Sequence, residues 1–222
     1  MGQMHTVEQG EYLASIAKYY EFADWHIIYD HPQNAEFRKK RPNPNILLPG
    51  DQLYIPDKQE KDVSCSTDQI HKFQLNAPKN ILKLTLKDTT GKPIRNQPYN
   101  LIFGHKTMRG TTDGQGLLQC QIPRDVHEAQ LILNKLHLTW NLKIGHLDPI
   151  EEKDEDKALN SGAHARLNNL GFFCGDVDGV LDSDMKGAIR MFQTEVMGRE
   201  PDRATGELDQ ETRAALEREH MC

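Results

Sequence analysis

The spacing of apolar residues changes twice along this chain of 222 residues, and the change limits the folds that the chain can adopt. Toward both ends, in residues 12–20 and 185–196, apolar side chains recur every three or four residues, which predicts amphipathic helices. Between them, Leu82, Leu84 and Leu86 alternate with polar residues, the two-residue period of a half-buried strand. The sequence therefore predicts an α+β chain of several domains, with helices toward the ends and a sheet in the middle.

Residues 4–57 predict a strand, two helices and a second strand. Asp24 can cap the second helix because its carboxylate can accept hydrogen bonds from the free N–H groups at a helix start. Prolines between residues 42 and 49 exclude a helix, and the alternating residues 52–55 predict a strand that Pro56 ends. The apolar face of the first helix consists of Tyr12, Leu13, Ile16, Ala17 and Tyr20, and that of the second of Trp25, Ile28 and Tyr29.

This order of elements resembles the LysM family, a small βααβ module that binds glycans containing N-acetylglucosamine, such as peptidoglycan. The shared motifs are Gly-Glu-x-Leu at residues 10–13, Ile-Ala at 16–17, and Asn-Pro-Asn with Pro-Gly-Asp-x-Leu-x-Ile-Pro within 43–56. The resemblance implies that a sugar lies in a shallow groove between two loops, with backbone groups on its N-acetyl amide and apolar side chains under its methyl. The implied glycan-binding residues are Gly10, Glu11, Tyr12 and Leu13 in one loop, and Asn43, Asn45, Ile46 and Leu47 in the other.

An insertion at residues 31–41 departs from the family pattern and ends in the basic run 38–41. The run either faces the carboxylates of peptidoglycan or forms a solvated patch or a protein contact. If the insertion covers the sugar groove, the module would bind protein instead of glycan.

The C-terminal residues contain an internal repeat. Gly-x-Leu-Asp at residues 179–182 recurs at 206–209, and each copy predicts a glycine turn, a buried leucine and an aspartate that caps a helix. An earlier helix has Ser161 as its expected cap and Gly171 as its left-handed end. The middle helix is expected to bury Met185, Ala188, Ile189, Phe192 and Val196.

Together with Leu-Gly-Phe-Phe at residues 170–173, the repeat resembles the three-helix peptidoglycan-binding-like module that is often appended to cell-wall hydrolases. The resemblance covers about residues 158–220, and some relatives with this fold bind proteins instead of glycan. It implies ligand contacts at the Asp-Gly turn and on one face of the middle helix. The candidate residues are Asp178, Gly179, Phe192 and Gln193.

The middle of the chain predicts short strands at residues 82–86, 99–103, 117–122, 131–133 and 138–144, with turns at Thr90-Gly91 and Asp113-Gly114. Strands at this spacing favour an antiparallel β-sandwich. The turn sequences are similar to transthyretin-like or carboxypeptidase-regulatory modules, which implies a spacer. The expected division is a LysM-like module at 1–57, a linker at 58–71, the sandwich at 72–148, an acidic linker at 149–157 and the helical module at 158–222.

Four cysteines leave two alternatives open. A disulfide between Cys174 and Cys222 would tie the C-terminus to its module in an oxidising compartment, and the alternative is free thiols. Cys65 and Cys120 are expected to be reduced. A zinc site from Cys174 and Cys222 with two histidines is conceivable, but its spacing matches no known finger. We expect no metal and no cofactor.

The motifs of hydrolases are absent from the sequence: it has no His-Glu-x-x-His, no Gly-x-Ser-x-Gly and no cysteine in a transpeptidase context. We therefore expect a protein that is not an enzyme. A formal net charge of −6 argues against nucleic acid as a partner. The sequence shows neither a signal peptide nor a membrane span.

The combination of these modules without a signal is similar to accessory proteins of type VI secretion and related contractile injection systems. That resemblance implies synthesis in the cytoplasm and action in the periplasm, at the cell wall or within the secretion apparatus. Two functions follow. In the first, both terminal modules bind peptidoglycan and anchor a partner at the wall through two weak sites. In the second, the modules hold a spike, effector or baseplate protein and bind no sugar.

Overall fold

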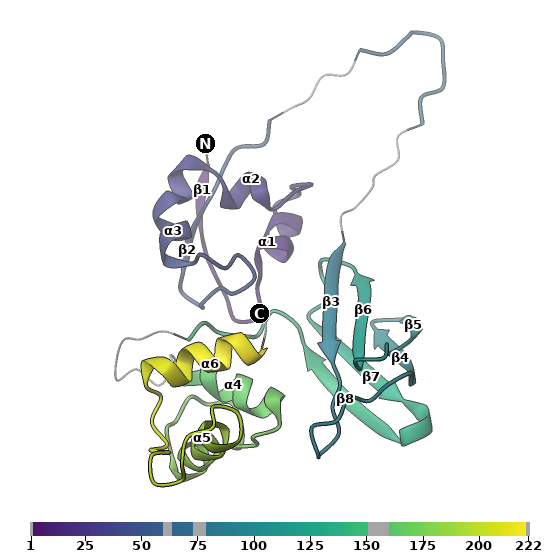
Figure 1. The fold of residues 1–222 in the computed structure, drawn as a ribbon. Coiled ribbons are helices and arrows are strands. Elements are labelled where there is room, and N and C mark those ends of the chain that lie inside the picture. The colour runs from purple at the N-terminus through teal and green to yellow at the C-terminus, as the bar shows by residue number, and fades with distance from the viewer. Residues whose placement is uncertain (1, 60–63, 73–78, 151–159, 221–222) are drawn as a thin grey trace. The chain divides into compact units, whose positions relative to one another are not determined.

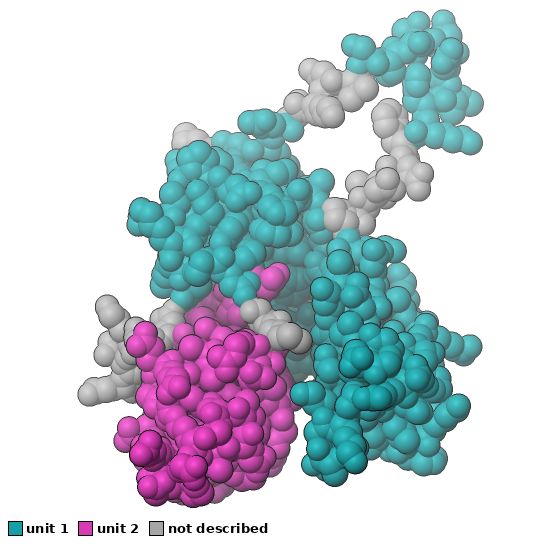
Figure 2. Space-filling view, viewed as in Figure 1, with its two compact units in different colours: residues 1–44, 49–145 teal, residues 45–48, 146–222 magenta. Residues whose placement is uncertain are grey.

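The computed structural model describes residues 2–59, 64–72, 79–150 and 160–220. The chain divides into two compact units, residues 1–44 with 49–145 and residues 45–48 with 146–222 (Figure 2). The first unit holds the elements predicted for the two N-terminal domains, and the second holds the C-terminal helices. The acidic linker predicted at 149–157 lies almost wholly outside the described residues. No helix in the described ranges is long and apolar enough to cross a membrane.

The N-terminal elements follow the predicted order, with additions inside the insertion (Figure 1). They are β1 (Gln3–Thr6), α1 (Leu13–Tyr19), α2 (His26–Tyr29), the 3₁₀ helix η1 (Pro32–Asn34), α3 (Ala35–Lys40) and β2 (Gln52–Ile55). Strands β1 and β2 pair antiparallel. The carboxylate of Asp24 accepts the backbone N–H of His26, the first residue of α2, at 3.0 Å, as predicted, but the N-cap position itself is Trp25.

The insertion is part of the N-terminal core. The side-chain amide of Asn34 donates to the carbonyls of Ile28 and Tyr54 and accepts the N–H of Tyr54, each at 2.8 Å, so it ties η1 to β2. Arg41, the last residue of the basic run, is buried and pairs with the buried Asp51 at 2.6 Å. A buried charge needs such a partner because desolvation is costly. Arg41 therefore belongs to the interior and cannot face peptidoglycan carboxylates.

The middle of the chain folds into two antiparallel sheets, as expected for a sandwich. One sheet pairs β3 (Asn80–Thr85) with β6 (Leu117–Ile122). The other has the order β5-β4-β7-β8. Its strands are β5 (Lys106–Thr111), β4 (Pro98–Phe103), β7 (Glu128–Leu133) and β8 (Leu138–Lys143), with η2 (Asn134–Leu136) before the last. Both sheets contribute buried side chains to one core, including Leu101, Leu118 and Leu131.

Strand β5 was missed by sequence analysis. Its residues, Lys-Thr-Met-Arg-Gly-Thr, lack an apolar alternation because this edge strand buries little. The predicted turns are confirmed: the carboxylate of Asp88 accepts the N–H groups of Thr90 and Lys92, and that of Asp113 accepts those of Gln115 and Leu117. A carboxylate that bonds to backbone N–H groups just after it is what favours aspartate at such turns.

The second unit carries α4 (Ser161–Leu170), α5 (Ser183–Glu195) and α6 (Gln210–His220) around one apolar core (Figure 1). The predicted caps at Asp182 and Asp209 are confirmed, because each carboxylate accepts a backbone N–H in the first turn of its helix. Gly171 ends α4 with φ of 93°, as predicted. The repeated glycines Gly179 and Gly206 both have positive φ, 73° and 76°. The two copies of the sequence repeat thus share one turn geometry.

Two predictions for the helices are wrong. Ser161 lies inside α4, where its hydroxyl donates to the carboxylate of Asp148 at 2.5 Å instead of capping the helix. Val196 follows the end of α5 and is exposed, because the chain turns there before the periodic pattern would bring it inward.

Candidate functional site

Two large apolar side chains of the C-terminal module are exposed in the loop between α4 and α5. The side chain of Phe173 is 81 % exposed and that of Val177 is 50 % exposed. The carboxylate of Asp178 is mostly exposed, and it accepts the N–H of Val180 at 2.8 Å. Sequence analysis selected Asp178 and Gly179 but missed Phe173 and Val177. Two adjacent phenylalanines beside a turn were the available signal, since a loop rarely buries both.

Side chains from α4 hold this loop in place. Asn168 accepts the N–H of Cys174 at 2.9 Å and donates to the carbonyl of Gly175 at 2.8 Å. The buried His164 donates from Nε2 to the carbonyl of Cys174 at 3.0 Å, and its Nδ1 lies 3.7 Å from the Asp178 carboxylate. Satisfied backbone groups fix the loop, so Phe173 projects from a preorganised support.

Cys174 is a free, buried thiol, and burial raises its pKa to about 11. Its proposed disulfide partner, Cys222, lies outside the described residues, so the bridge stays a prediction. In the described ranges, no group of three or more His, Cys, Asp or Glu residues could hold a metal ion.

Phe192 and Gln193 have no exposed surface. The ring of Phe192 packs edge to face on Phe172, with centroids 5.5 Å apart. The amide of Gln193 donates to the carbonyl of Glu207 and the hydroxyl of Thr212, and accepts the N–H of Gly206, each at 3.0 Å. Both residues therefore belong to the core. Because their side chains are buried, they cannot make the ligand contacts that were expected from the sequence.

Polar contacts within the first unit engage the loop at residues 10–13. Tyr12 donates its hydroxyl to the carbonyls of Arg124 at 2.5 Å and Val126 at 3.2 Å. His127 donates from Nδ1 to the carbonyl of Gly10 at 3.0 Å. Burial raises the pKa of Tyr12 to about 12. The carbonyl of Gly10 and the hydroxyl of Tyr12 therefore already have protein partners.

Most residues of the two predicted sugar loops are inaccessible. Leu13, Ile46 and Leu47 are 2 %, 8 % and 5 % exposed. Asn43 and Glu11 are partly buried, and Asn45 is exposed. Residues 45–48 belong to the second compact unit, whereas residues 10–13 belong to the first. Within each loop, the buried side chains of Leu13, Ile46 and Leu47 offer a ligand little surface.

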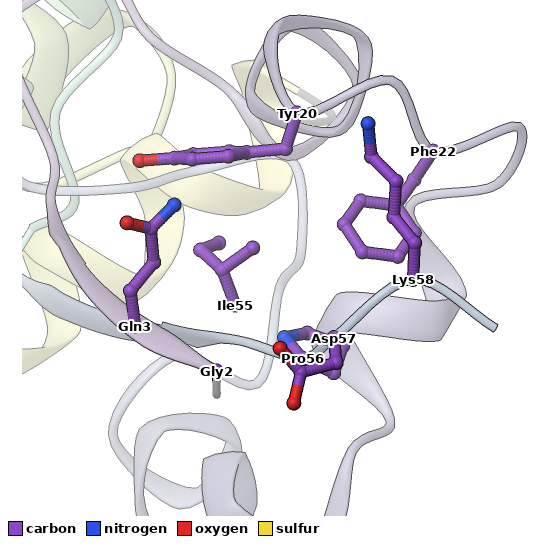
Figure 3. Close-up of a pocket in the computed structure, with 8 residues that line it drawn as sticks. All are labelled: Gly2, Gln3, Tyr20, Phe22, Ile55, Pro56, Asp57 and Lys58. Atoms are coloured by element: carbon purple, nitrogen blue, oxygen red, sulfur yellow. The ribbon is translucent and has the colours of Figure 1, made fainter.

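Glu11 takes part in a chain of polar contacts that leads to a different part of the module. Its carboxylate accepts from the N–H of Glu8 at 2.8 Å and lies 2.9 Å from Nε2 of His5. Nδ1 of His5 lies 3.2 Å from the hydroxyl of Tyr20. The ring of Tyr20 forms one wall of a cavity of about 170 Å³ between the end of α1 and strands β1 and β2 (Figure 3).

Comparison with known protein families supports the C-terminal module predicted from the sequence. Residues 163–216 match the family model described as "Putative peptidoglycan binding domain". The match begins in α4 and ends in α6, so it includes the loop that exposes Phe173, and it supports the module predicted from the repeat. Searches of curated proteins and of solved structures found no match to the chain.

Proposed function

We propose that this protein is a non-catalytic adaptor that binds peptidoglycan through its C-terminal module and holds a partner at the bacterial cell wall. The observation that carries the proposal is the family match over residues 163–216, which coincides with a fixed loop that exposes Phe173 and Val177. An exposed aromatic ring on a fixed loop, with polar groups beside it, offers a ligand both an apolar face and hydrogen-bond partners.

The loop offers the groups that a glycan with peptide stems would need. A sugar ring can stack its C–H face on Phe173, and the exposed carboxylates of Asp176 and Asp178 can accept hydrogen bonds from hydroxyl, amide or ammonium groups. The contacts from Asn168 and His164 hold the loop before any ligand arrives, which lowers the entropy cost of binding.

Co-sedimentation of the full chain with insoluble peptidoglycan sacculi tests this proposal. Phe173→Ala is expected to weaken binding about tenfold, which corresponds to about 1.4 kcal/mol. Met191→Ala is the matched control, because Met191 is also exposed and lies on α5 of the same module. A wild-type chain that stays in the supernatant would refute peptidoglycan binding. Equal sedimentation of both variants and the wild type would refute the role of Phe173.

A second candidate function is a structural joint that binds protein and no sugar. The engagement of Gly10 and Tyr12 by residues 124–127 favours it, since these loop groups already serve a protein contact. The partner would be a spike, effector or baseplate protein of a type VI or related contractile injection system. Binding to such a purified protein that persists in excess soluble peptidoglycan fragments would support this function.

A further inference from the structure

An open cavity in the N-terminal part of the first unit has the chemistry of a small amphipathic binding site. Its walls include three apolar side chains: the ring of Tyr20 lies over Ile55, and Phe22 closes one side (Figure 3). Its rim is polar, with the side-chain amide of Gln3 near one end and the ammonium of Lys58 near the other. A ligand with an apolar face and hydrogen-bonding groups around its edge would match both surfaces.

The walls of the cavity are held from outside it. The hydroxyl of Tyr20 forms a hydrogen bond with His5, and His5 forms one with the carboxylate of Glu11. These contacts hold the phenol ring from outside the cavity. Lys58 pairs with Glu21, which places its ammonium beside the opening. Ile55 is buried in β2 and provides a rigid floor. The site is therefore built before a ligand enters, which favours even a small ligand.

The size and polarity of the cavity select one class of ligand. A volume of about 170 Å³ is smaller than the roughly 300–1,000 Å³ of pockets for drug-sized ligands, so it suits one ring. An apolar side chain of a partner protein would leave the side-chain amide of Gln3 without a hydrogen-bond partner, which costs free energy. A pyranose ring has both an apolar C–H face for Tyr20 and a rim of hydroxyl and amide groups for Gln3 and Lys58.

We propose that this cavity binds one saccharide ring of the glycan strand, and that the N-terminal sugar contact lies here instead of at loops 10–13 and 43–47. The inference rests on the proposed function, because it takes its ligand from the wall polymer. Such a site would give the chain a second glycan contact although Gly10 and Tyr12 are engaged by other residues of the first unit. Glu11 then acts indirectly, by positioning His5 and Tyr20.

Titration of the full chain with a soluble N-acetylglucosamine tetramer tests the inference, with affinity measured by calorimetry and the site located by NMR shift changes. Tyr20→Ala should weaken binding at least tenfold. Gln3→Ala should weaken it several-fold, and because Gln3 is exposed on β1 this variant should stay folded. Met4→Ala is the matched control: Met4 follows Gln3 on β1, is 58 % exposed and does not line the cavity, so binding should be unchanged.

No binding of the tetramer by the wild type overturns the inference. Binding that Tyr20→Ala and Gln3→Ala both leave unchanged, or shift changes confined to other residues, overturns it as well. Failure of the proposed function is a separate result, because that function is tested by co-sedimentation of the wild type and Phe173→Ala with sacculi. If the chain sediments with sacculi in a way that depends on Phe173 but does not bind the tetramer, saccharide binding by the cavity is refuted and the C-terminal site is retained.

Discussion

Replacing Gln193 by Leu is expected to destabilise the C-terminal helices by about 3 kcal/mol, because three buried hydrogen bonds are lost at about 1 kcal/mol each. Gln193 is fully buried, and its amide joins α5 to the N–H of Gly206, the carbonyl of Glu207 and the hydroxyl of Thr212. Leucine is similar in size, so the cavity term is small and the loss of free energy comes from unpaired polar groups.

Native-state hydrogen exchange of the full chain measures this change without separating the module from the rest. A loss of about 3 kcal/mol raises exchange of the α5 and α6 amides by about 100-fold, since each 1.4 kcal/mol is a factor of ten. Gln210→Leu is the control, because Gln210 is exposed at the start of α6. Exchange that changes less than about threefold in Gln193→Leu would refute the reasoning, because satisfied buried amides are expected to stabilise a fold.

Three further predictions concern titratable side chains. Tyr12→Phe removes a hydroxyl that donates to two backbone carbonyls, so thermal unfolding of the first unit, followed by tryptophan fluorescence, should show a loss of about 1 kcal/mol; an unchanged transition would contradict this. Because burial raises the pKa of Cys174 to about 11, iodoacetamide should label exposed Cys65 and spare Cys174 in the native chain, as read by mass spectrometry. Burial, with the charge of Arg166, lowers the pKa of His220 to about 4. An unfolded histidine titrates near pH 6.5, so the unfolded state binds more protons between the two values, and stability should be full above pH about 6.5 and fall toward pH about 4. In denaturant titrations between these pH values, His220→Gln should lose less stability than the wild type as the pH falls. An equal loss in the two proteins would contradict the role of His220.

The features that the sequence predicted well are those set by neighbouring residues. An aspartate before a periodic apolar run is enough to predict the caps at Asp182 and Asp209, and a glycine after such a run is enough to predict the end of α4 at Gly171. The match over residues 163–216 supports the module inferred from the repeat. These signals are local, so a single sequence contains them.

The features that the sequence could not predict depend on long-range packing. Helical spacing places Phe192 and Gln193 on or near one face of α5. It does not predict that Gln193 forms hydrogen bonds with Gly206 and Thr212. Nothing near Tyr12 in the sequence indicates that its hydroxyl meets residues 124–126. The exposure of Phe173 and the cavity at Tyr20 likewise arise only when separate elements come together.

The most direct test of peptidoglycan binding by the C-terminal module is hydrogen exchange of the full chain with and without soluble peptidoglycan fragments that carry peptide stems. The account predicts slower exchange in residues 172–180, the loop that exposes Phe173, with Met191 and its neighbours on α5 unchanged. Saturating fragments that leave exchange in residues 172–180 unaltered would contradict the account.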